Sequence, residues 1–453
     1  MQFVQFVQFV RTSRLQPFET QTHVVSSQEW GWPVTYGNDA VRKLELDTDQ
    51  HAAGYRAELL ANPFAGHTPD LAADTGLLFD VGHATKVREA FSSWTDYQPT
   101  PLTPLPGLAS RLRIGEIWAK DEGLRQPVKS FKALGASYAL ECHLRKLVAR
   151  KTGLLPPELT SRRLRDHGLK QLFGDIVVTC ASDGNHGLAL AWTASEFGCQ
   201  CRVYLPTAVS SNRAAAIASY GAEIIRVDGS YDEAVELAWQ ESLANGWQMI
   251  SDTALDGYVT VPADVMRGYS LMVEEVFRSQ AAGQTFSHVF LQLGVGAMAA
   301  AVIQCFRAGW PGPLPKFVTV EPDTAASLYL SLQRGESKRV YGRHETIMTG
   351  LSTGALSTLA WPVLKTGVDY AMTINDAPVA EAMRWLAAGA HDDAPIVAGE
   401  TGAGGVAALM VAAADDRLRE FLDLSGDSRV LVIITEGATD PDRYDQIVGD
   451  ATG

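Results

Sequence analysis

Between residues 175 and 245, short apolar segments alternate with longer segments of helical periodicity, and no other feature constrains the fold as strongly. Short apolar runs bounded in this way predict buried strands. The expected strands are 175–180, 201–205 and 223–227, and the expected helices are 187–197, 213–220 and 232–245. Because strands and helices in this order form parallel βαβ units, the sequence predicts an α/β fold with twisted, mostly parallel sheets flanked by helices.

Length and charge limit the classes of protein to consider. With 453 residues and 46% hydrophobic content, the chain can bury a substantial core and form two domains. It has 38 basic and 52 acidic residues, a formal charge of −14, which argues against a nucleic-acid or anionic-membrane partner. No segment approaches the roughly 18 apolar residues of a membrane span. We therefore expect a soluble protein.

The five cysteines indicate a reducing compartment. They are odd in number and include no CxxC spacing, so neither a disulfide framework nor a zinc ribbon is expected. The sequence predicts a cytoplasmic protein without a metal site. The opening repeat of Gln-Phe-Val over residues 2–10 lacks the basic region of a signal peptide. It is interpreted as an extension or an edge strand, with a transit peptide as the alternative.

A lysine lies at the start of a predicted helix. Residues 132–144 are rich in small and apolar side chains, and Ser130 is expected to be the N-cap of this helix. Lys132 then lies in the first turn, where the helix dipole and burial are both expected to lower the pKa of its amine. A neutral amine is the form that makes a Schiff base. The alternative is a solvated surface lysine, which is how we interpret Lys120 and Lys129.

A glycine-containing turn joins a predicted strand, residues 287–293, to a predicted helix, residues 299–306. Gly294 and Gly296 fall in this turn. Glycines there let backbone N–H groups approach an anion, and the helix N-terminus adds a favourable potential, so a phosphate is the expected occupant. The spacing matches neither the dinucleotide fingerprint nor a P-loop. A turn that is closely packed for steric reasons is the alternative.

The motifs stand in an order that resembles a known family. The chain is similar to fold type II pyridoxal-phosphate (PLP) enzymes, and within them it most resembles diaminopropionate ammonia-lyase. The resemblance covers roughly residues 91–448. The matching stretches include Ser130-Phe131-Lys132, Asp183-Gly184-Asn185-His186-Gly187, Asp252-Thr253-Ala254, Gly294-Val295-Gly296-Ala297-Met298 and Thr435-Glu436-Gly437.

The resemblance assigns the cofactor contacts. Lys132 would form the Schiff base with PLP, Asn185 would bind the ring hydroxyl, and Thr435 would face the pyridine nitrogen. A hydroxyl at that nitrogen does not stabilise its protonated form, which favours expulsion of a β-substituent over transamination. The phosphate would be held by the backbone amides of Gly294, Val295, Gly296, Ala297 and Met298.

The resemblance also places two aspartates near the substrate, Asp183 and Asp252. In the family, the first is credited with removing the α-proton of the D-substrate, while the lysine serves the L-substrate. Removing a proton from opposite faces of one carbon requires bases on opposite sides of the cofactor. The alternative for Asp183 is an N-cap of the helix 187–197, and His186 is interpreted as a packing or hydrogen-bonding residue.

Three neighbourhoods depart from the family pattern, at residues 129–130, 255–258 and 352–353. The reaction type is therefore predicted more firmly than the β-substituent. The expected reaction is PLP-dependent elimination on a small amino acid, with 2,3-diaminopropionate as the leading substrate and pyruvate and ammonia as products. The alternatives are a serine or threonine dehydratase, a β-replacement enzyme or racemase of the same fold, and a PLP-binding protein without turnover.

The resemblance implies a domain division and an oligomer. Residues 1–134 and 256–453 are expected to form a large cofactor-binding domain, and residues 135–255 a smaller α/β domain, with the cofactor in the cleft between them. A homodimer is expected. Residues 155–172, which contain two prolines and several arginines, are interpreted as an insertion that forms a surface loop, with a dimer contact as the alternative.

Overall fold

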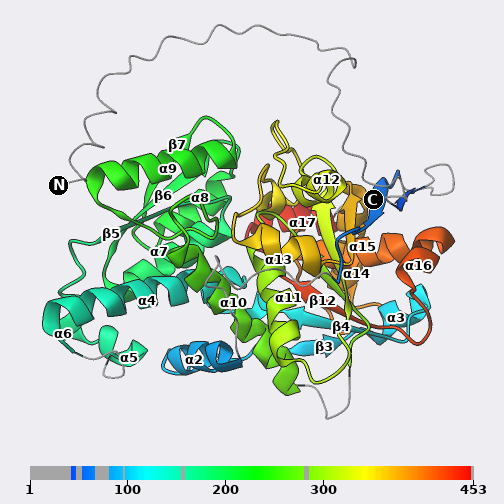
Figure 1. The fold of residues 1–453 in the computed structure, drawn as a ribbon, viewed down its shortest axis with the longest axis horizontal. Coiled ribbons are helices and arrows are strands. Elements are labelled where there is room, and N and C mark those ends of the chain that lie inside the picture. Colours follow the sequence, from blue (N-terminus) through cyan, green and yellow to red (C-terminus); the bar gives the residue numbers. More distant parts are fainter. Residues whose placement is uncertain are drawn as a thin grey trace, which may run out of the picture. The chain divides into compact units, whose positions relative to one another are not determined.

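The computed structural model describes residues 42–46, 54–66, 81–94, 97–154, 159–279 and 285–449 (Figure 1). The expectations for the Gln-Phe-Val repeat, and for most of the first ninety residues, lie outside this part of the chain. Among the helices built from the described residues, none has the length and apolar character needed to cross a membrane.

The smaller of two sheets is parallel throughout, with strand order β7-β6-β5-β8. Three of its strands confirm the predicted ones within two residues at each end, and the fourth is short. Their bounds are β5 Val177–Ala181, β6 Gln200–Pro206, β7 Glu223–Val227 and β8 Gln248–Met249. The α/β class predicted from the alternation is thereby confirmed.

The predicted helices of this region are also present. They are α7 Asn185–Phe197, α8 Ser211–Ala218 and α9 Tyr231–Asn245. The start of α9 is fixed locally, because Ser230 and Glu233 form a reciprocal capping box. In Figure 1 the sheet lies between α9 on one face and α7 with α4, Lys132–Thr152, on the other.

The larger sheet has eight strands in the order β1-β2-β11-β10-β9-β12-β4-β3. Its five inner strands from β11 to β4 run parallel, whereas β2 and β3 pair antiparallel beside them and β1 pairs antiparallel with β2. The bounds are β1 Lys43–Glu45, β2 Ala57–Ala61, β3 Leu102–Pro104, β4 Glu116–Asp121, β9 His288–Gln292, β10 Lys316–Pro322, β11 Tyr370–Ile374 and β12 Arg429–Ile434. The inner strands are almost entirely buried, as parallel strands covered on both faces must be.

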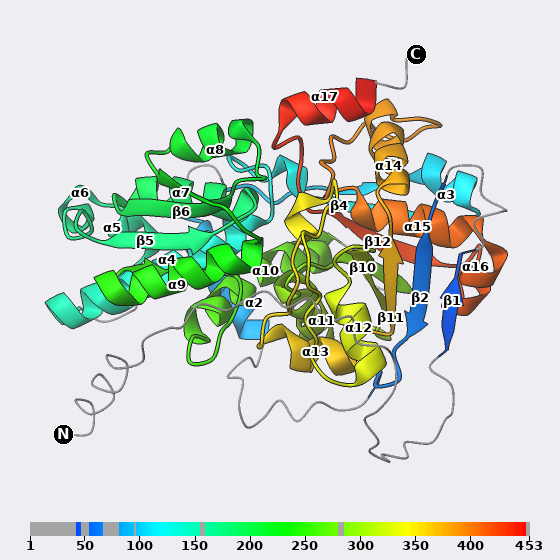
Figure 2. The same cartoon turned by 90° about the horizontal axis from the view of Figure 1, so that it is seen from above.

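Helices cover this sheet on both sides (Figure 2). The longer ones are α2 Val81–Phe91, α10 Thr260–Ser279, α11 Ala297–Gly309, α14 Ala377–Ala388 and α15 Gly404–Ala414. The shorter ones are α3 Pro106–Leu112, α12 Ser327–Arg334, α13 Ala360–Gly367, α16 Asp416–Leu422 and α17 Pro441–Gly449.

Two glycines let α10 pack closely against α4, the helix that begins at Lys132. A Cβ on Gly268 would lie 2.4 Å from the carbonyl oxygen of Leu134, and one on Gly135 would lie 2.4 Å from a ring carbon of Tyr269. Both contacts are impossible for a larger residue. The first turn of α4 is therefore held against α10, which fixes where the lysine lies.

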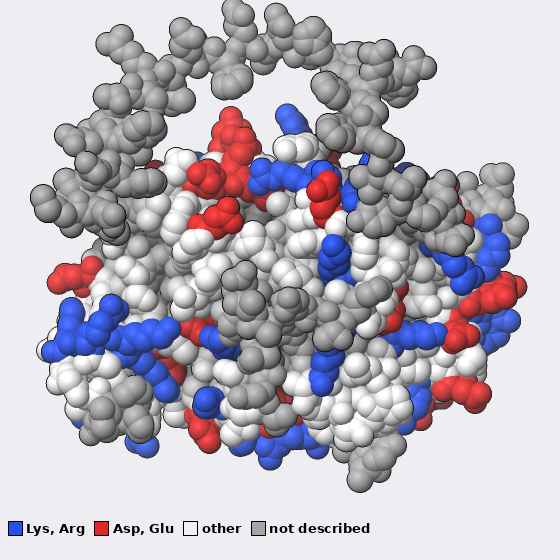
Figure 3. All heavy atoms as spheres, viewed as in Figure 1, with Lys and Arg blue, Asp and Glu red and all other residues white. Residues whose placement is uncertain are grey.

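The segment predicted as a surface loop folds differently. Its described part contains two short helices, α5 Ser161–Leu164 and α6 His167–Lys170. Leu159 and Leu164 are fully buried, so the described part of the segment is packed onto the body by its apolar residues rather than looped out. Basic side chains gather over α4 and α6 in Figure 3, and those at the end of α4 include Arg150 and Lys151.

The predicted division into two domains stays a prediction. The two separate sheets agree with it, but its first boundary, after residue 134, falls inside the continuous helix α4.

Candidate active site

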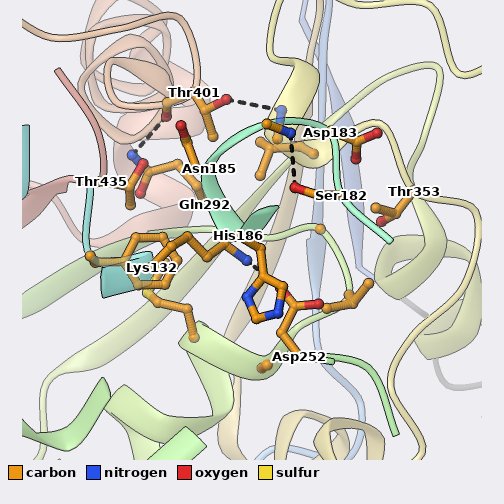
Figure 4. A pocket seen from close by; sticks show the side chains of 18 of the residues that line it. Lys132, Ser182, Asp183, Asn185, His186, Asp252, Gln292, Thr353, Thr401 and Thr435 are labelled. Carbon is orange, nitrogen blue, oxygen red and sulfur yellow. Dashed lines mark hydrogen bonds and ion pairs between the residues drawn. The ribbon is translucent and has the colours of Figure 1, made fainter. Parts of the chain in front are cut away.

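One cavity of about 760 Å³, including its open mouth, is lined by residues from both sheets (Figure 4). Several of its residues lie within three positions of the carboxyl end of a parallel strand: Asp183 after β5, Asp252 after β8, Gly294 after β9 and Thr435 after β12. Ligands of open α/β sheets bind at these carboxyl ends. Every residue predicted for the site lines this cavity, namely Lys132, Asp183, Asn185, Asp252, Gly294, Val295, Gly296, Ala297, Met298 and Thr435.

Lys132 is the first residue of α4, as predicted, but the cap is different. The N-cap position belongs to Phe131, and Ser130 accepts only a long hydrogen bond, 3.4 Å, from the Lys132 amide. Ser130 instead forms a β-bridge with Glu436, and the Phe131 amide donates to the Thr435 carbonyl at 3.2 Å. These contacts hold the start of α4 against the end of β12. The position of the Lys132 amine is therefore set by the larger sheet and not by an N-cap side chain.

The expectation of a lowered lysine pKa is wrong for this structure. Lys132 Nζ donates to Asp252 Oδ2, and Tyr231 donates its hydroxyl to Asp252 Oδ1 at 3.1 Å. Burial does lower the pKa of the Lys132 amine, but the Asp252 carboxylate outweighs it, so the pKa lies above its ordinary value. Burial raises the pKa of Asp252, yet Lys132 and then His186 hold it below its ordinary value. The pair therefore favours a charged amine held by the Asp252 carboxylate.

Asp183 does not cap α7, so the capping interpretation is wrong. Gly184 occupies the N-cap position at a φ of 140°, and Ser182 Oγ accepts from the amides of Gly184 and Gly187 at 2.9 and 2.8 Å. The Asp183 carboxyl is thus left for another role. Burial, followed by the nearby Asp252 charge, raises the pKa of Asp183 to about 8. A carboxyl that titrates near neutrality is suited to general acid–base work.

His186 has the structural role predicted for it. It is buried, its Nε2 lies 2.7 Å from the Ile250 carbonyl oxygen, and burial lowers the pKa of its ring. The bond joins α7 to the segment that carries Asp252.

Thr435 and Asn185 line the same side of the cavity (Figure 4). Thr435 Oγ1 is buried and finds no hydrogen-bond partner among the described residues. A buried hydroxyl without a partner is costly, which indicates that a ligand supplies one. Asn185 donates its Nδ2 to Glu436, whose other oxygen accepts from the Thr401 amide at 3.0 Å. A binding role for the Asn185 side chain stays a prediction.

The glycine turn has the geometry of an anion cradle. Gly296 is the N-cap of α11 with a φ of 88°, and a Cβ there would lie 2.6 Å from Leu364 Cδ1. At Gly294 a Cβ would lie 3.1 Å from the Gly350 carbonyl oxygen. The first amides of a helix have no partner within the helix, so those at the start of α11 are free to bind a phosphate.

Several other residues that line the cavity have no role predicted from the sequence. Arg213 is expected only as the first residue of a helix, and no role is assigned to Tyr231, Gln292, Thr353 and Thr401. Each of them reaches the cavity from a different element. Their positions depend on the packing of the two sheets.

This cavity suits PLP, because it offers an amine for the aldehyde, a partnerless hydroxyl for the ring and an amide turn for the phosphate. With the two-sheet architecture, it defines the class as the fold type II PLP enzymes. A family model described as "Pyridoxal-phosphate dependent enzyme" matches residues 94–436, and the chain belongs to this family.

The comparisons also confirm the more specific resemblance. Diaminopropionate ammonia-lyase from Escherichia coli (strain K12) is 34% identical over 380 residues, which cover 83% of this chain and 93% of that protein. L-threonine ammonia-lyase from Thermotoga maritima is 26% identical over 343 residues, 75% of this chain and 71% of that protein. The crystal structure of Escherichia coli diaminopropionate ammonia lyase in complex with an aminoacrylate-PLP azomethine reaction intermediate matches with a TM-score of 0.77 and 32% identity, covering 87% of this chain and 97% of that one.

Proposed function

We propose that this chain is an ammonia-lyase that uses PLP to convert 2,3-diaminopropionate to pyruvate and ammonia by α,β-elimination. The observation that carries the proposal is the set of three ionisable groups around one cavity: the Lys132–Asp252 pair and, apart from it in Figure 4, the Asp183 carboxyl. An enzyme that removes α-protons needs bases in this arrangement, whereas a protein that only binds PLP does not.

The cofactor supplies an electron sink for the negative charge that forms at the substrate α-carbon. The chain supplies the proton transfers. Lys132 and Asp183 are the candidate bases for the L- and D-enantiomers, and Asp252 holds the lysine amine by a hydrogen bond. Thr435 brings a hydroxyl, not a carboxylate, to the predicted ring position, which favours rapid loss of the β-substituent.

The elimination releases aminoacrylate, which hydrolyses without further catalysis. Diaminopropionate and one water molecule therefore give one pyruvate and two molecules of ammonia. Serine would give one pyruvate and one ammonia. The ratio of ammonia to keto acid thus reports which leaving group departs.

A serine or threonine dehydratase is the second candidate. It is favoured by one feature of the cavity, the Thr353 hydroxyl, which is buried, lines the site and has no partner in the described structure. A hydroxyl there is a suitable hydrogen-bond partner for the β-hydroxyl of serine or threonine.

The two candidates are separated by turnover. Purified holoenzyme is incubated with each enantiomer of diaminopropionate, serine and threonine, and keto acid and ammonia are both measured. We expect keto acid from diaminopropionate with ammonia in a ratio near two. Keto acid from serine with none from diaminopropionate would assign the dehydratase, and the absence of any keto acid from all six would leave a binding protein, a racemase or a β-replacement enzyme.

We also propose that the enzyme acts as a homodimer in the cytoplasm. All five cysteines are free, in keeping with a reducing compartment. Light scattering of the holoenzyme during size-exclusion chromatography tests the dimer, and a mass near 49 kDa, that of one chain, would contradict it.

A further inference from the structure

Arg213 is a buried cation beside Asp183, and no sequence motif predicts that it lies there. Its side chain, 7% exposed, comes from α8 and lines both the active-site cavity and an adjoining cavity that shares Asp183 and Tyr231 with it. A Cβ on Gly184 would lie 3.0 Å from Arg213 Cδ, so the arginine stem packs directly on the backbone that follows Asp183.

The guanidinium is anchored by one of its nitrogens. Nη1 donates to the Asp183 carbonyl oxygen at 3.4 Å and to Thr349 Oγ1. Nε and Nη2 are buried and have no hydrogen-bond partner in the part of the chain that the structure describes. Arg213 therefore fixes the Asp183 segment while part of its hydrogen-bonding capacity stays open.

The acidic neighbour of Arg213 is shared with another arginine. Glu400 Oε2 lies 3.6 Å from Arg213 Nη2, whereas Glu400 Oε1 lies 2.9 Å from Arg443 Nε. The longer of these two contacts exceeds an ordinary hydrogen bond. Glu400 thus neutralises the Arg213 charge only in part.

Apart from Lys132, the other ionisable groups that act on Asp183 do not favour its ionisation. Asp252 and Asp232 repel a charge on it, and Tyr231 faces it as a neutral phenol. Lys132 attracts it, but the lysine amine is paired with Asp252. Asp232 itself is paired with Arg339 and faces His344. The other charged or titratable residues that line the adjoining cavity are His344, Arg343, Glu345, Asp440 and Arg443.

We propose that Arg213 is a positioning residue for α-proton removal, which fixes the backbone of Asp183 and stabilises the charge of its carboxylate. The inference rests on the proposed function, because Asp183 acts as a base only if the enzyme removes α-protons. The physical reason is Coulombic: a buried cation whose guanidinium reaches the Asp183 backbone favours the ionised carboxyl in this low-dielectric site. In agreement, Arg213 opposes the effect of burial and of Asp252 on the pKa of Asp183.

The first test measures the proton on Asp183 directly and needs no turnover. Holoenzyme carrying ¹³C at the aspartate carboxyl carbons is titrated by NMR, and the Asp183→Asn variant identifies the resonance. We expect R213Q to raise the midpoint by about one pH unit or more, and R213K, which keeps the charge, to stay close to the wild type. An unchanged midpoint in R213Q, or the same rise in R213K, overturns the inference.

The Thr349→Val variant provides a second test of the inference in case the R213Q protein does not fold. It removes the hydroxyl that anchors Nη1 and leaves the arginine in place. We expect the Asp183 midpoint to rise by less than in R213Q. If Thr349→Val leaves the midpoint unchanged in a chain whose R213Q variant does not fold, Arg213 has a purely structural role and the inference fails.

The second test uses turnover, so that the two proposals fail separately. In the wild type, keto acid formation from D-diaminopropionate should increase with pH as Asp183 loses its proton, around pH 8. In R213Q this rise should move to higher pH, while the profile for the L-enantiomer moves less. If the wild type forms no keto acid from diaminopropionate, the proposed function is wrong, and the NMR titration still decides the role of Arg213.

Discussion

Two ionic clusters lie in the interior of the described part of the chain. They differ in whether all of their hydrogen-bonding groups have partners. The first, here called the closed network, consists of Lys120, Glu122, Arg125 and Glu275, with side chains at most 4% exposed. The second, here called the open group, is Lys132, Asp183, Arg213 and Asp252 around the cavity. The closed network satisfies itself, whereas the open group leaves hydrogen-bonding capacity for a ligand.

The closed network is complete in both charge and hydrogen bonds. Lys120 Nζ lies 2.6 Å from Glu275 Oε2 and from the Thr100 carbonyl oxygen, and Arg125 donates to both Glu122 and Glu275. Two cations face two anions, and none of their side-chain nitrogens or oxygens is buried without a partner within the described structure. The interpretation of Lys120 as a surface lysine is therefore wrong, because its charge is compensated in the interior.

The open group has the same types of residue but is not complete. Within the described residues, two nitrogens of Arg213 and the hydroxyl of Thr435 beside the group have no hydrogen-bond partner. The pKa of Asp183 is raised, to about 8, whereas that of Glu275 is lowered. Buried hydrogen-bonding groups without partners lower the stability of the chain when no ligand is bound. A cluster that contains such groups therefore indicates where a ligand binds.

The largest effect should come from Lys132→Ala. This change removes the amine that holds PLP, so keto acid formation should fall by ~10⁴-fold or more and the absorbance of lysine-bound PLP should disappear. Lys151→Ala, in the last turn of the same helix, is the matched control and should leave both unchanged. A Lys132→Ala protein that is still yellow and active would show that the open group is not the reaction centre.

A smaller and selective loss is expected for Asp183→Asn. The amide cannot accept the α-proton, so turnover of D-diaminopropionate should fall by roughly 10²- to 10⁴-fold, while turnover of the L-enantiomer survives in part. The measurement is kcat/KM for each enantiomer. Equal losses for both would give Asp183 a general electrostatic role in the open group.

In the closed network, Glu275→Gln should reduce stability and not chemistry. It leaves Lys120 and Arg125 with one buried anion between them, which should lower the free energy of unfolding by about 3–5 kcal/mol in urea denaturation. The neighbouring Glu274→Gln, whose partners Arg88 and Arg278 are 36% and 61% exposed, should cost no more than about 1 kcal/mol. Similar costs for the two variants would mean that the closed network does not stabilise the fold.

The cost of Glu275→Gln should also depend on pH. Burial opposes ionisation of Glu275, but Arg125 and Lys120 hold its pKa below the ordinary value of 4.5. A carboxyl with a lowered pKa stabilises the fold above its unfolded value and loses this contribution as the pH falls. The difference between wild type and variant should therefore shrink below pH 4.5, and a difference that grows there would contradict the charge assignment.

The smallest effects on stability are expected when one threonine hydroxyl is removed. They should depend on whether that hydroxyl has a hydrogen-bond partner. Thr435→Val removes a hydroxyl that has no partner in the described structure, so the cofactor-free chain should change in stability by less than about 1 kcal/mol while PLP binds a few-fold more weakly. Thr193→Val removes a hydroxyl that donates to the Ala189 carbonyl at 2.7 Å. It should cost about 1–2 kcal/mol and leave PLP affinity unchanged. The opposite pattern would mean that Thr435 does not face the cofactor.

Local sequence determined the strands and helices and the identity of the cofactor. The alternation between residues 175 and 245 predicted β5 to β7 and their helices, because burial on both faces demands short apolar runs. The lysine and the glycine turn indicate PLP because each is a local feature of the sequence. The lysine is a side chain at the start of a helix, and the glycine turn is a backbone conformation. The same reasoning failed for the lysine pKa, since Asp252 is 120 residues away in the chain.

Which charged groups meet depends on the tertiary packing. Lys120 and Lys132 lie close together in the sequence, yet Lys120 pairs with Glu275 of α10 in the closed network, whereas Lys132 pairs with Asp252 beside the cavity. Arg213 meets Asp183 and Thr349 through hydrogen bonds of its guanidinium, contacts that neither stretch of sequence predicts. Electrostatic energy depends on distance and burial, and both are set by the packing of the sheets rather than by spacing along the chain.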